Sequence, residues 1–213
     1  MSNKDHWEHV YGTKAPNAVS WYAPHLETSL NLIHQASTDK SAAIIDIGGG
    51  ESTLVDDLLA EGYQDISVLD ISQKAIDLTE ENVTLNAGFK GKHQSIVADV
   101  VKYIREIGDD FDLIILDPPA FAKSLKARHN AVQAYKRLNA EALRKIKPGG
   151  ILFTFSCSQV VDKRLFANTI TAAALDSKRN VRILHQLSQP ADHPINCFHP
   201  ETEYLKGLVL YVD

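Results

Sequence analysis

Two short segments of the sequence carry residue types that suit chemistry on a planar nitrogen compound. The first, Asp117-Pro118-Pro119-Ala120-Phe121, follows an apolar run. Because proline fixes φ and lacks an amide proton, two prolines make a rigid turn whose carbonyls stay free to accept hydrogen bonds. The Asp117 carboxylate can pair with an exocyclic amine or a ring nitrogen. The segment predicts a substrate site, with a stiff strand exit as the alternative; the substrate-binding residues expected are Pro118, Pro119, Phe121 and Lys123.

The second segment, Phe155-Ser156-Cys157-Ser158, ends the next apolar run. Carbon 5 of a cytosine is a poor nucleophile, and it becomes reactive when a cysteine thiolate first adds to carbon 6. Exocyclic amines need no such help. Cys157, with Asp117 holding the base, therefore predicts a catalytic pair for methylation of a ring carbon. The alternative is that Cys157 is a small buried core residue.

A glycine-rich segment, Asp46-Ile47-Gly48-Gly49-Gly50-Glu51-Ser52, follows the first apolar run. Glycines allow a tight turn and let backbone amides approach a ligand. An aspartate closes the second run at Asp70, 24 residues after Asp46, where it can accept hydrogen bonds from ribose hydroxyls. Another closes the third run at Asp99. Each acid alone could be a helix N-cap, and NAD is the main rival ligand. No P-loop lysine follows the glycines, which argues against ATP hydrolysis.

The glycine segment resembles the D-x-G-x-G-x-G loop of class I methyltransferases, with Ser52 in place of the third glycine. In that family the loop cradles S-adenosylmethionine (SAM), which leaves as S-adenosylhomocysteine. The resemblance implies the following cofactor contacts: Asp46, Gly48, Gly49, Gly50, Asp70, Ile71, Asp99, Val100 and Asp117.

The elements that position these residues alternate between strands and helices. Strands are expected at 42–47, 66–71, 95–98, 113–116, 151–155, 181–184 and 208–212, and apolar helix faces at 54–59, 76–85 and 132–146. Lys147-Pro148-Gly149-Gly150 is expected to stop the third helix and turn into the next strand. No helical pattern joins the last two strands, so they should be antiparallel. The predicted fold is α/β and Rossmann-like, a class I methyltransferase sheet of order 3-2-1-4-5-7-6 with only strand 7 antiparallel.

Residues from about 80 to 213 resemble the bacterial 23S ribosomal RNA 5-methylcytosine methyltransferases. Five segments carry this resemblance: 117–124, 147–152, 156–158, 189–194 and 200–208. The resemblance implies that Cys157 is the nucleophile. Residues 1–79, with Trp7, Tyr11-Gly12-Thr13 and Val19-Ser20-Trp21-Tyr22, instead resemble small class I methyltransferases, in which an aromatic N-terminal segment folds over SAM. Simple packing of Trp7 and Trp21 is the alternative.

The chain is expected to form one methyltransferase domain over residues 1–213, with residues 1–40 as a helical cap. The two resemblances meet near residues 76–82, and the charge balance changes there too. Residues 1–80 hold 4 Lys or Arg and 13 Asp or Glu, whereas residues 81–213 hold 18 and 14. These observations suggest a chimera of two methyltransferases; a divergent natural enzyme is the alternative. Two further hypotheses are a SAM-binding scaffold with little turnover and a small-molecule methyltransferase.

Charge and composition limit the partners. The net charge of −5 argues against a general nucleic-acid binder, although the stretch 123–147 holds eight Lys or Arg against Glu141 alone. That stretch can face phosphates or be a solvated helix face, so RNA is expected to bind weakly at best. No apolar run suits a membrane span, and no secretory signal is visible. Two cysteines without metal-type spacing favour a cytoplasmic protein without a metal.

Overall fold

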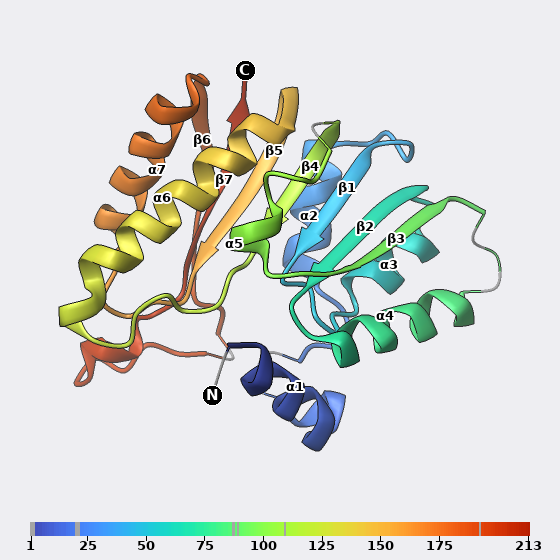
Figure 1. The fold of residues 1–213 in the computed structure, drawn as a ribbon, viewed down its shortest axis with the longest axis horizontal. Helices are drawn as coiled ribbons and strands as arrows, with labels where there is room; N and C mark the ends of the chain where they lie inside the picture. The colour runs from blue at the N-terminus through green and yellow to red at the C-terminus, as the bar shows by residue number, and fades with distance from the viewer. Residues whose placement is uncertain (1–2, 20–21, 87, 89, 109, 192) are drawn as a thin grey trace. The chain divides into compact units, whose positions relative to one another are not determined.

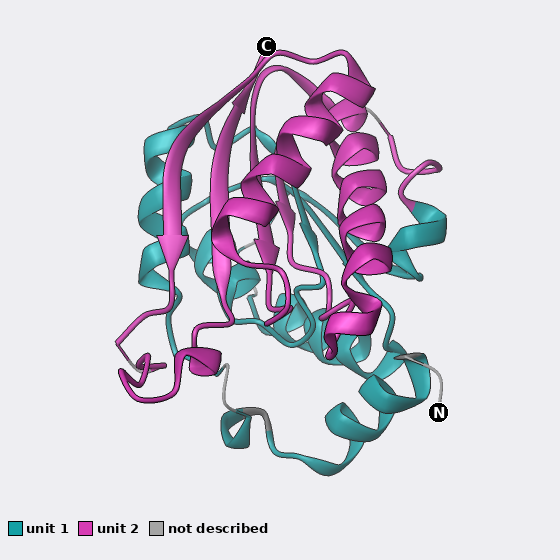
Figure 2. Cartoon of the chain, turned by 90° about the vertical axis from the view of Figure 1, so that its left-hand side faces the viewer, with its two compact units in different colours: residues 1–103 teal, residues 104–213 magenta. Residues whose placement is uncertain are grey.

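The computed structural model describes all residues except 1–2, 20–21, 87, 89, 109 and 192. Ser20, Trp21 and Asp192, which belong to the motifs above, therefore lie outside the described residues. The chain divides into two compact units, residues 1–103 and 104–213 (Figure 2). In the described part of the chain, no helix combines the length and apolar character that crossing a bilayer requires.

Unit 1 contains three parallel strands. β1 (Ala43–Ile47) pairs with β2 (Asp65–Asp70), and β2 pairs with β3 (Lys92–Val97). Its helical elements are α1 (Asn3–Thr13), η1 (Pro16–Ala18), α2 (Glu27–Ala36), α3 (Leu54–Ala60), α4 (Gln73–Leu85) and α5 (Val100–Tyr103) (Figure 1). Each strand ends within two residues of an aspartate, so the parallel arrangement brings the glycine segment, Asp70 and Asp99 to the carboxyl ends of the strands.

The core of unit 1 follows the expected apolar pattern in most places. The residues predicted for the first helix face are all buried: Leu54, Val55, Leu58 and Leu59. Along α4, Ile76 is buried, but Leu85 is 75% exposed, so the predicted apolar face was wrong at its last residue. The reason is that Leu85 lies in the last turn of α4, beyond the part of the helix whose residues are buried.

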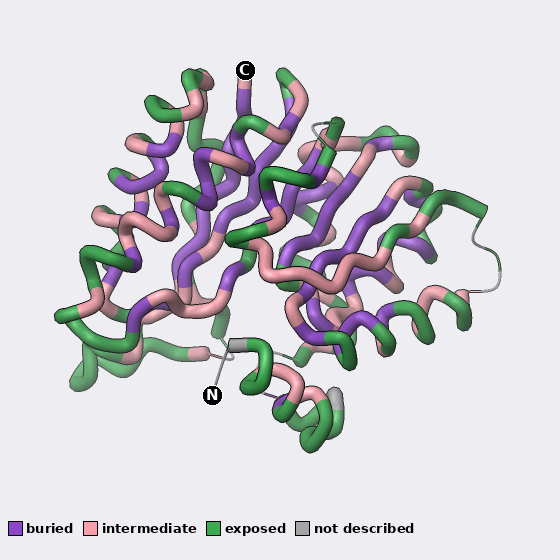
Figure 3. The backbone as a smooth tube through the Cα atoms, in the orientation of Figure 1, coloured by how far each residue is buried: buried purple, intermediate pink, exposed green. Residues whose placement is uncertain are grey.

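Unit 2 contains four strands: β4 (Phe111–Leu116), β5 (Ile146–Ser156), β6 (Val181–Ser188) and β7 (Lys206–Val212). β5 is parallel to β4 and antiparallel to β7, which in turn is antiparallel to β6. The helical elements are η2 (Leu125–Ala127), α6 (Arg128–Lys145), α7 (Lys163–Ser177) and η3 (Pro200–Thr202). The long helices α6 and α7 lie side by side, and buried residues line β4, β5 and β7, whereas no residue of β6 is buried (Figure 3).

The seven strands have the order β3-β2-β1-β4-β5-β7-β6, with β7 antiparallel to its neighbours. Between β6 and β7 the described residues form no helix beyond the short turn η3. The predicted fold is confirmed. One detail was wrong, because Lys147–Gly150 lies inside β5 and not in a turn before it. β5 starts at Ile146, opposite Phe111, and a bulge then shifts the pairing so that Leu113 meets Ile151.

Candidate functional site

The glycine segment of unit 1 wraps around the carboxylate of Asp46. Gly48 has φ of 87°, and its amide donates to the carbonyl of Leu69 on the neighbouring strand, at 2.8 Å. A β-carbon on Gly49 would stand 2.5 Å from Oδ2 of the buried Asp46. Gly50 has φ of 55°, a left-handed conformation that side chains disfavour. This loop geometry therefore requires glycine at positions that the sequence singled out.

Asp70 lies beside this loop and is the most strongly perturbed acid of unit 1. Its side chain is 6% exposed, and it accepts hydrogen bonds from the backbone amides of Ser72 (at 2.8 Å), Gly50 and Ile71. Burial outweighs these bonds and raises its pKa to about 6. The structure thus joins the end of β2 to the glycine loop, and Asp70 stays mostly ionised at pH 7.

Asp99 has a simpler local role. Its carboxylate accepts a hydrogen bond from the amide of Val101 at 3.0 Å, and it lies 3.9 Å from Nζ of Lys102. Both interactions belong to the start of the short helix α5, so Asp99 caps that helix. The amide of Ala98 donates to the carbonyl of Asp70 at 2.9 Å. This bond places Asp99 and Val100, at the end of β3, next to the end of β2 where Asp70 lies. The second carboxylate oxygen of Asp99 can still accept a further hydrogen bond.

Helix α1 packs against the same loop. Oε1 of Glu8 accepts a hydrogen bond from the amide of Gln73 at 2.7 Å, at the start of α4. A β-carbon on Gly50 would overlap the Tyr11 hydroxyl, and Trp7 stacks on Tyr11 with ring centroids 5.8 Å apart. Tyr11 thus lies over the glycine loop with Trp7 stacked on it; the marked Trp21 lies outside the described residues.

In unit 2, hydrogen bonds fix the turn after β4 against the turn after β5. Oγ of Ser158 accepts from the amide of Ala122 at 3.3 Å and lies 3.0 Å from the Tyr135 hydroxyl. Phe121 packs edge-on against the ring of Tyr135, with centroids 4.6 Å apart. The Asp-Pro-Pro segment and the Ser-Cys-Ser segment are consequently held as neighbours.

Cys157 and Asp117 lie close enough to influence each other. Burial is the main cause that raises the pKa of the Cys157 thiol, and the negative charge of Asp117 raises it further. A hydrogen bond from the Ala120 amide and the positive charge of Lys206 oppose this increase. Asp117 keeps access to solvent, yet desolvation of its carboxylate by the surrounding protein raises its pKa to about 6.

The sequence singled out Lys206 only as one member of a longer motif. In the structure it is a buried lysine next to the Cys157 turn. A lysine that begins an apolar strand was the available signal, although such residues usually lie exposed at the strand end.

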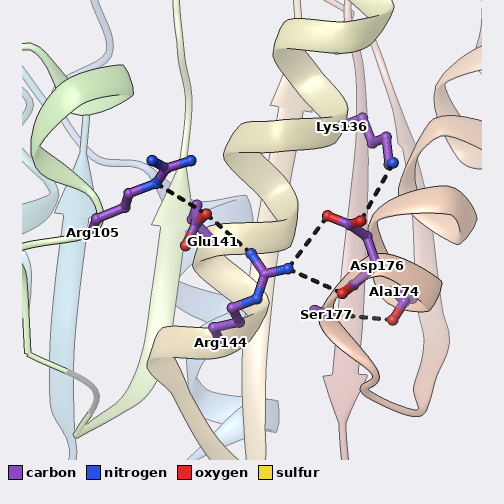
Figure 4. Close-up of polar contacts among 7 residues, drawn as sticks. All are labelled: Arg105, Lys136, Glu141, Arg144, Ala174, Asp176 and Ser177. Carbon is purple, nitrogen blue, oxygen red and sulfur yellow. Dashed lines mark hydrogen bonds and ion pairs between the residues drawn. The ribbon is translucent and has the colours of Figure 1, made fainter.

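Ion pairs engage three of the eight basic residues in the stretch 123–147. Lys136 and Arg144 form ion pairs with Asp176, and Arg144 also pairs with Glu141, which holds Arg105 (Figure 4). Lys147 pairs with Asp112 at 2.8 Å. These residues hold α6, α7 and β5 in place and contribute less free charge than the sequence suggested. An exposed basic cluster remains directly after the Asp117 turn and is formed by Lys123, Lys126 and Arg128.

Both cysteines are free, and the described residues contain no group of three or more His, Cys, Asp or Glu side chains arranged to hold a metal ion. The family model for the methyltransferase small domain matches residues 16–182. The chain belongs to this methyltransferase family. A single model therefore runs through residues 76–82, and the comparisons give no support to a fusion there.

Among curated relatives, ribosomal RNA large subunit methyltransferase I from Aeromonas hydrophila is 42% identical over 155 residues, 71% of this chain and 39% of that protein. The protein of the same name from Alteromonas mediterranea is 40% identical over 158 residues, 72% of this chain and 40% of that protein. This chain thus spans about two-fifths of the length of these relatives.

Two solved structures show the same fold at low identity. Trm5b from Pyrococcus abyssi aligns with a TM-score of 0.65 at 19% identity, over 91% of this chain and 50% of that one. The N-methyltransferase NodS from Bradyrhizobium japonicum aligns with a TM-score of 0.64 at 12% identity, over 99% of this chain and 97% of that one. Together with the family match, they confirm the prediction of a Rossmann-like methyltransferase, for which SAM is the cofactor.

Proposed function

We propose that this chain transfers a methyl group from SAM to carbon 5 of a cytosine in RNA, with Cys157 as nucleophile. The observation that carries the proposal is the placement of a partly exposed thiol beside the Asp117-Pro118-Pro119 turn, where the charge of Asp117 acts on it. The relatives named ribosomal RNA large subunit methyltransferase I support RNA as the substrate class.

The residues of unit 1 fit the cofactor. Gly48, Gly49 and Gly50 carry no β-carbons, so the backbone amides of the loop can approach the amino-acid end of SAM, while the Asp46 carboxylate lies against Gly49. The Asp70 carboxylate accepts three amides and has about four lone-pair sites, which leaves capacity for a ribose hydroxyl. Ile71 follows the end of β2, and Asp99 and Val100 follow the end of β3; these three residues would contact the adenine. We further propose that residues 1–213 act as one domain, with residues 1–40 as a cap on the loop.

The residues of unit 2 fit the base. A thiolate at Cys157 adds to carbon 6 and forms the sulfur–carbon bond, and the electron pair of the ring double bond forms the new bond between carbon 5 and the methyl group. S-adenosylhomocysteine leaves as the methyl group is transferred. Solvent then accepts the carbon 5 proton, the electron pair of the broken C–H bond restores the ring double bond, and the thiolate leaves carbon 6. SAM supplies the methyl group. Asp117, whose pKa is raised, can share a proton with the ring nitrogen on which negative charge develops.

The exposed basic cluster supports an RNA substrate. It follows the Asp117 turn within eleven residues, so phosphates flanking a flipped-out base are within its reach. The acidic composition of residues 1–80 opposes this attraction, and we expect weak RNA binding that depends strongly on salt. Free thiols at Cys157 and Cys197 agree with a cytoplasmic location, which is part of the proposal.

The test incubates the full chain and labelled SAM with 23S ribosomal RNA, free nucleobases and a panel of small amines, and identifies the methylated product by mass. We expect 5-methylcytidine in RNA, which should be lost in Cys157→Ala. It should be retained in Cys197→Ala, because Cys197 is exposed and distant from Cys157 in the sequence. Methyl transfer that persists in Cys157→Ala would indicate an amine or small-molecule substrate. Binding of SAM without transfer to any acceptor would indicate a scaffold.

A further inference from the structure

Lys206 is a charged residue in the core of unit 2. Only 4% of its surface is exposed, and no other described lysine or arginine is buried to this degree. It opens β7 opposite Ser156 of β5, the residue before Cys157. Its Nζ donates hydrogen bonds to the carbonyl of Ser158, the residue after Cys157, and to the carbonyl of Tyr204, both at 2.7 Å. The amino group therefore lies beside the turn that carries the thiol.

Among the described residues, no carboxylate forms an ion pair with Lys206. Its two acceptors are neutral carbonyls, and a buried ammonium without a paired carboxylate is unfavourable. Two acids whose negative charges act on Lys206 have other partners: Asp162 accepts from the Leu165 amide as the cap of α7, and Glu203 pairs with Lys163 at 2.5 Å. Burial lowers the pKa of Lys206 to about 8, and the charge of Cys157 is the largest influence in the opposite direction.

A cavity of about 330 Å³ reaches this lysine. Lys206 lines it together with polar residues that include Gln159 after β5, Lys163 of α7 and Glu203 before β7. Protons can therefore reach the amino group from solvent even though the side chain is buried.

We propose that Lys206 is a positioning residue for the nucleophile: it holds the carbonyl that follows Cys157 and stabilises the thiolate with its positive charge. The inference rests on the proposed role of Cys157. Two backbone carbonyls occupy two of its N–H groups and fix Nζ in place. A neutral Lys206 can accept the proton from Sγ. The S–H bond breaks, an ammonium–thiolate pair forms, and no electrons are exchanged with a further reactant.

The test measures how fast iodoacetamide alkylates Cys157 as a function of pH, in a Cys197→Ser background that removes the other thiol. Removing the charge with Lys206→Met should shift the pH midpoint upward by about one unit and lower the rate at pH 7.5 about tenfold, because the thiolate fraction falls tenfold per unit. The rate at the alkaline plateau should stay within about twofold. Lys206→Arg, which keeps the charge, should restore most of the original profile.

Lys147→Met is the matched control, since Lys147 lies near the other end of β5 and pairs with Asp112. It should leave the profile unchanged. A Lys206→Met profile that superimposes on the parent, or an equal shift in both variants, would overturn the proposal. If Lys206→Met does not fold, NMR titration of Lys206 in the parent chain decides: blocking Cys157 as a neutral thioether should lower the pKa of Lys206, and an unchanged titration would overturn the proposal. Neither readout uses RNA or SAM, so failure of RNA methylation alone would count against the proposed function and not against this inference.

Discussion

Replacing Asp70 by asparagine should stabilise the protein at neutral pH and weaken cofactor binding at the same time. The carboxylate is 6% exposed, and burial raises its pKa from 3.8 to about 6 despite three amide donors. The folded state therefore binds a proton more tightly than the unfolded state. The contribution of Asp70 to the unfolding free energy is therefore largest below pH 4, falls as the pH rises from about 4 to 6, and stays lower above that range. Two pKa units correspond to roughly 3 kcal/mol.

Asparagine resembles the protonated acid and does not titrate. We expect the unfolding free energy of Asp70→Asn to exceed that of the parent by up to about 3 kcal/mol at pH 7.5 and to match it near pH 4. Urea unfolding of both proteins at pH 4, 5, 6 and 7.5 gives this difference, in which the contributions of all other acids cancel.

Cofactor affinity should change in the opposite direction. The loss of a charged acceptor for the ribose costs about 1.5–3 kcal/mol, which titration calorimetry with SAM would detect. Asp65→Asn is the control, because Asp65 begins the same strand β2 and pairs with Lys92 at its surface. A parent–variant difference in stability that does not depend on pH, or SAM binding equal to that of the control, would refute the reasoning.

Two further predictions concern the glycine loop and the basic cluster. Gly50→Ala should destabilise the fold by about 2 kcal/mol or more, because it combines a left-handed φ with overlap onto the Tyr11 hydroxyl; Gly62→Ala, with φ of 89° and open space around it, should cost only about 1 kcal/mol. Thermal unfolding compares the two, and equal losses would contradict the role of Tyr11. Neutralising Lys123, Lys126 and Arg128 with glutamine should reduce the salt dependence of RNA binding by about 2 in the log–log slope, whereas Lys136→Gln should leave it unchanged because Lys136 already faces Asp176. A fall of about 0.7 in the slope for Lys136→Gln would show that the ion pair does not shield Lys136.

The sequence predicted the elements well where local pattern decides structure. β1 and β2 are continuous apolar runs bounded by turn residues, and their parallel pairing follows from the helices between them. The meeting of Gly50 with Asp70 follows from the same topology. The position of Lys147–Gly150 was not predictable in this way, because a bulge that depends on pairing with Phe111 and Leu113 lets the strand begin earlier.

Interactions between distant segments were the part that the sequence did not specify. The sequence predicted that Lys136 and Arg144 contribute free positive charge. In the structure both form ion pairs with Asp176, which lies on another helix, α7. Burial of Lys206 likewise depends on carbonyls of two turns that come together only in the folded unit. A charge pattern gives the number of charges on a segment, but tertiary packing decides which of them remain available for a ligand.

The covalent role of Cys157 can be tested most directly with RNA that contains 5-fluorocytosine. Fluorine at carbon 5 prevents the elimination that releases the thiolate, so the chain, SAM and this RNA should give a complex that survives denaturing electrophoresis and carries the added methyl group by mass. Cys157→Ala should form none, and Cys197→Ala should form as much as the parent. Carbon 5 methylation of ordinary RNA without a trapped complex, or a complex that persists in Cys157→Ala, would contradict the account.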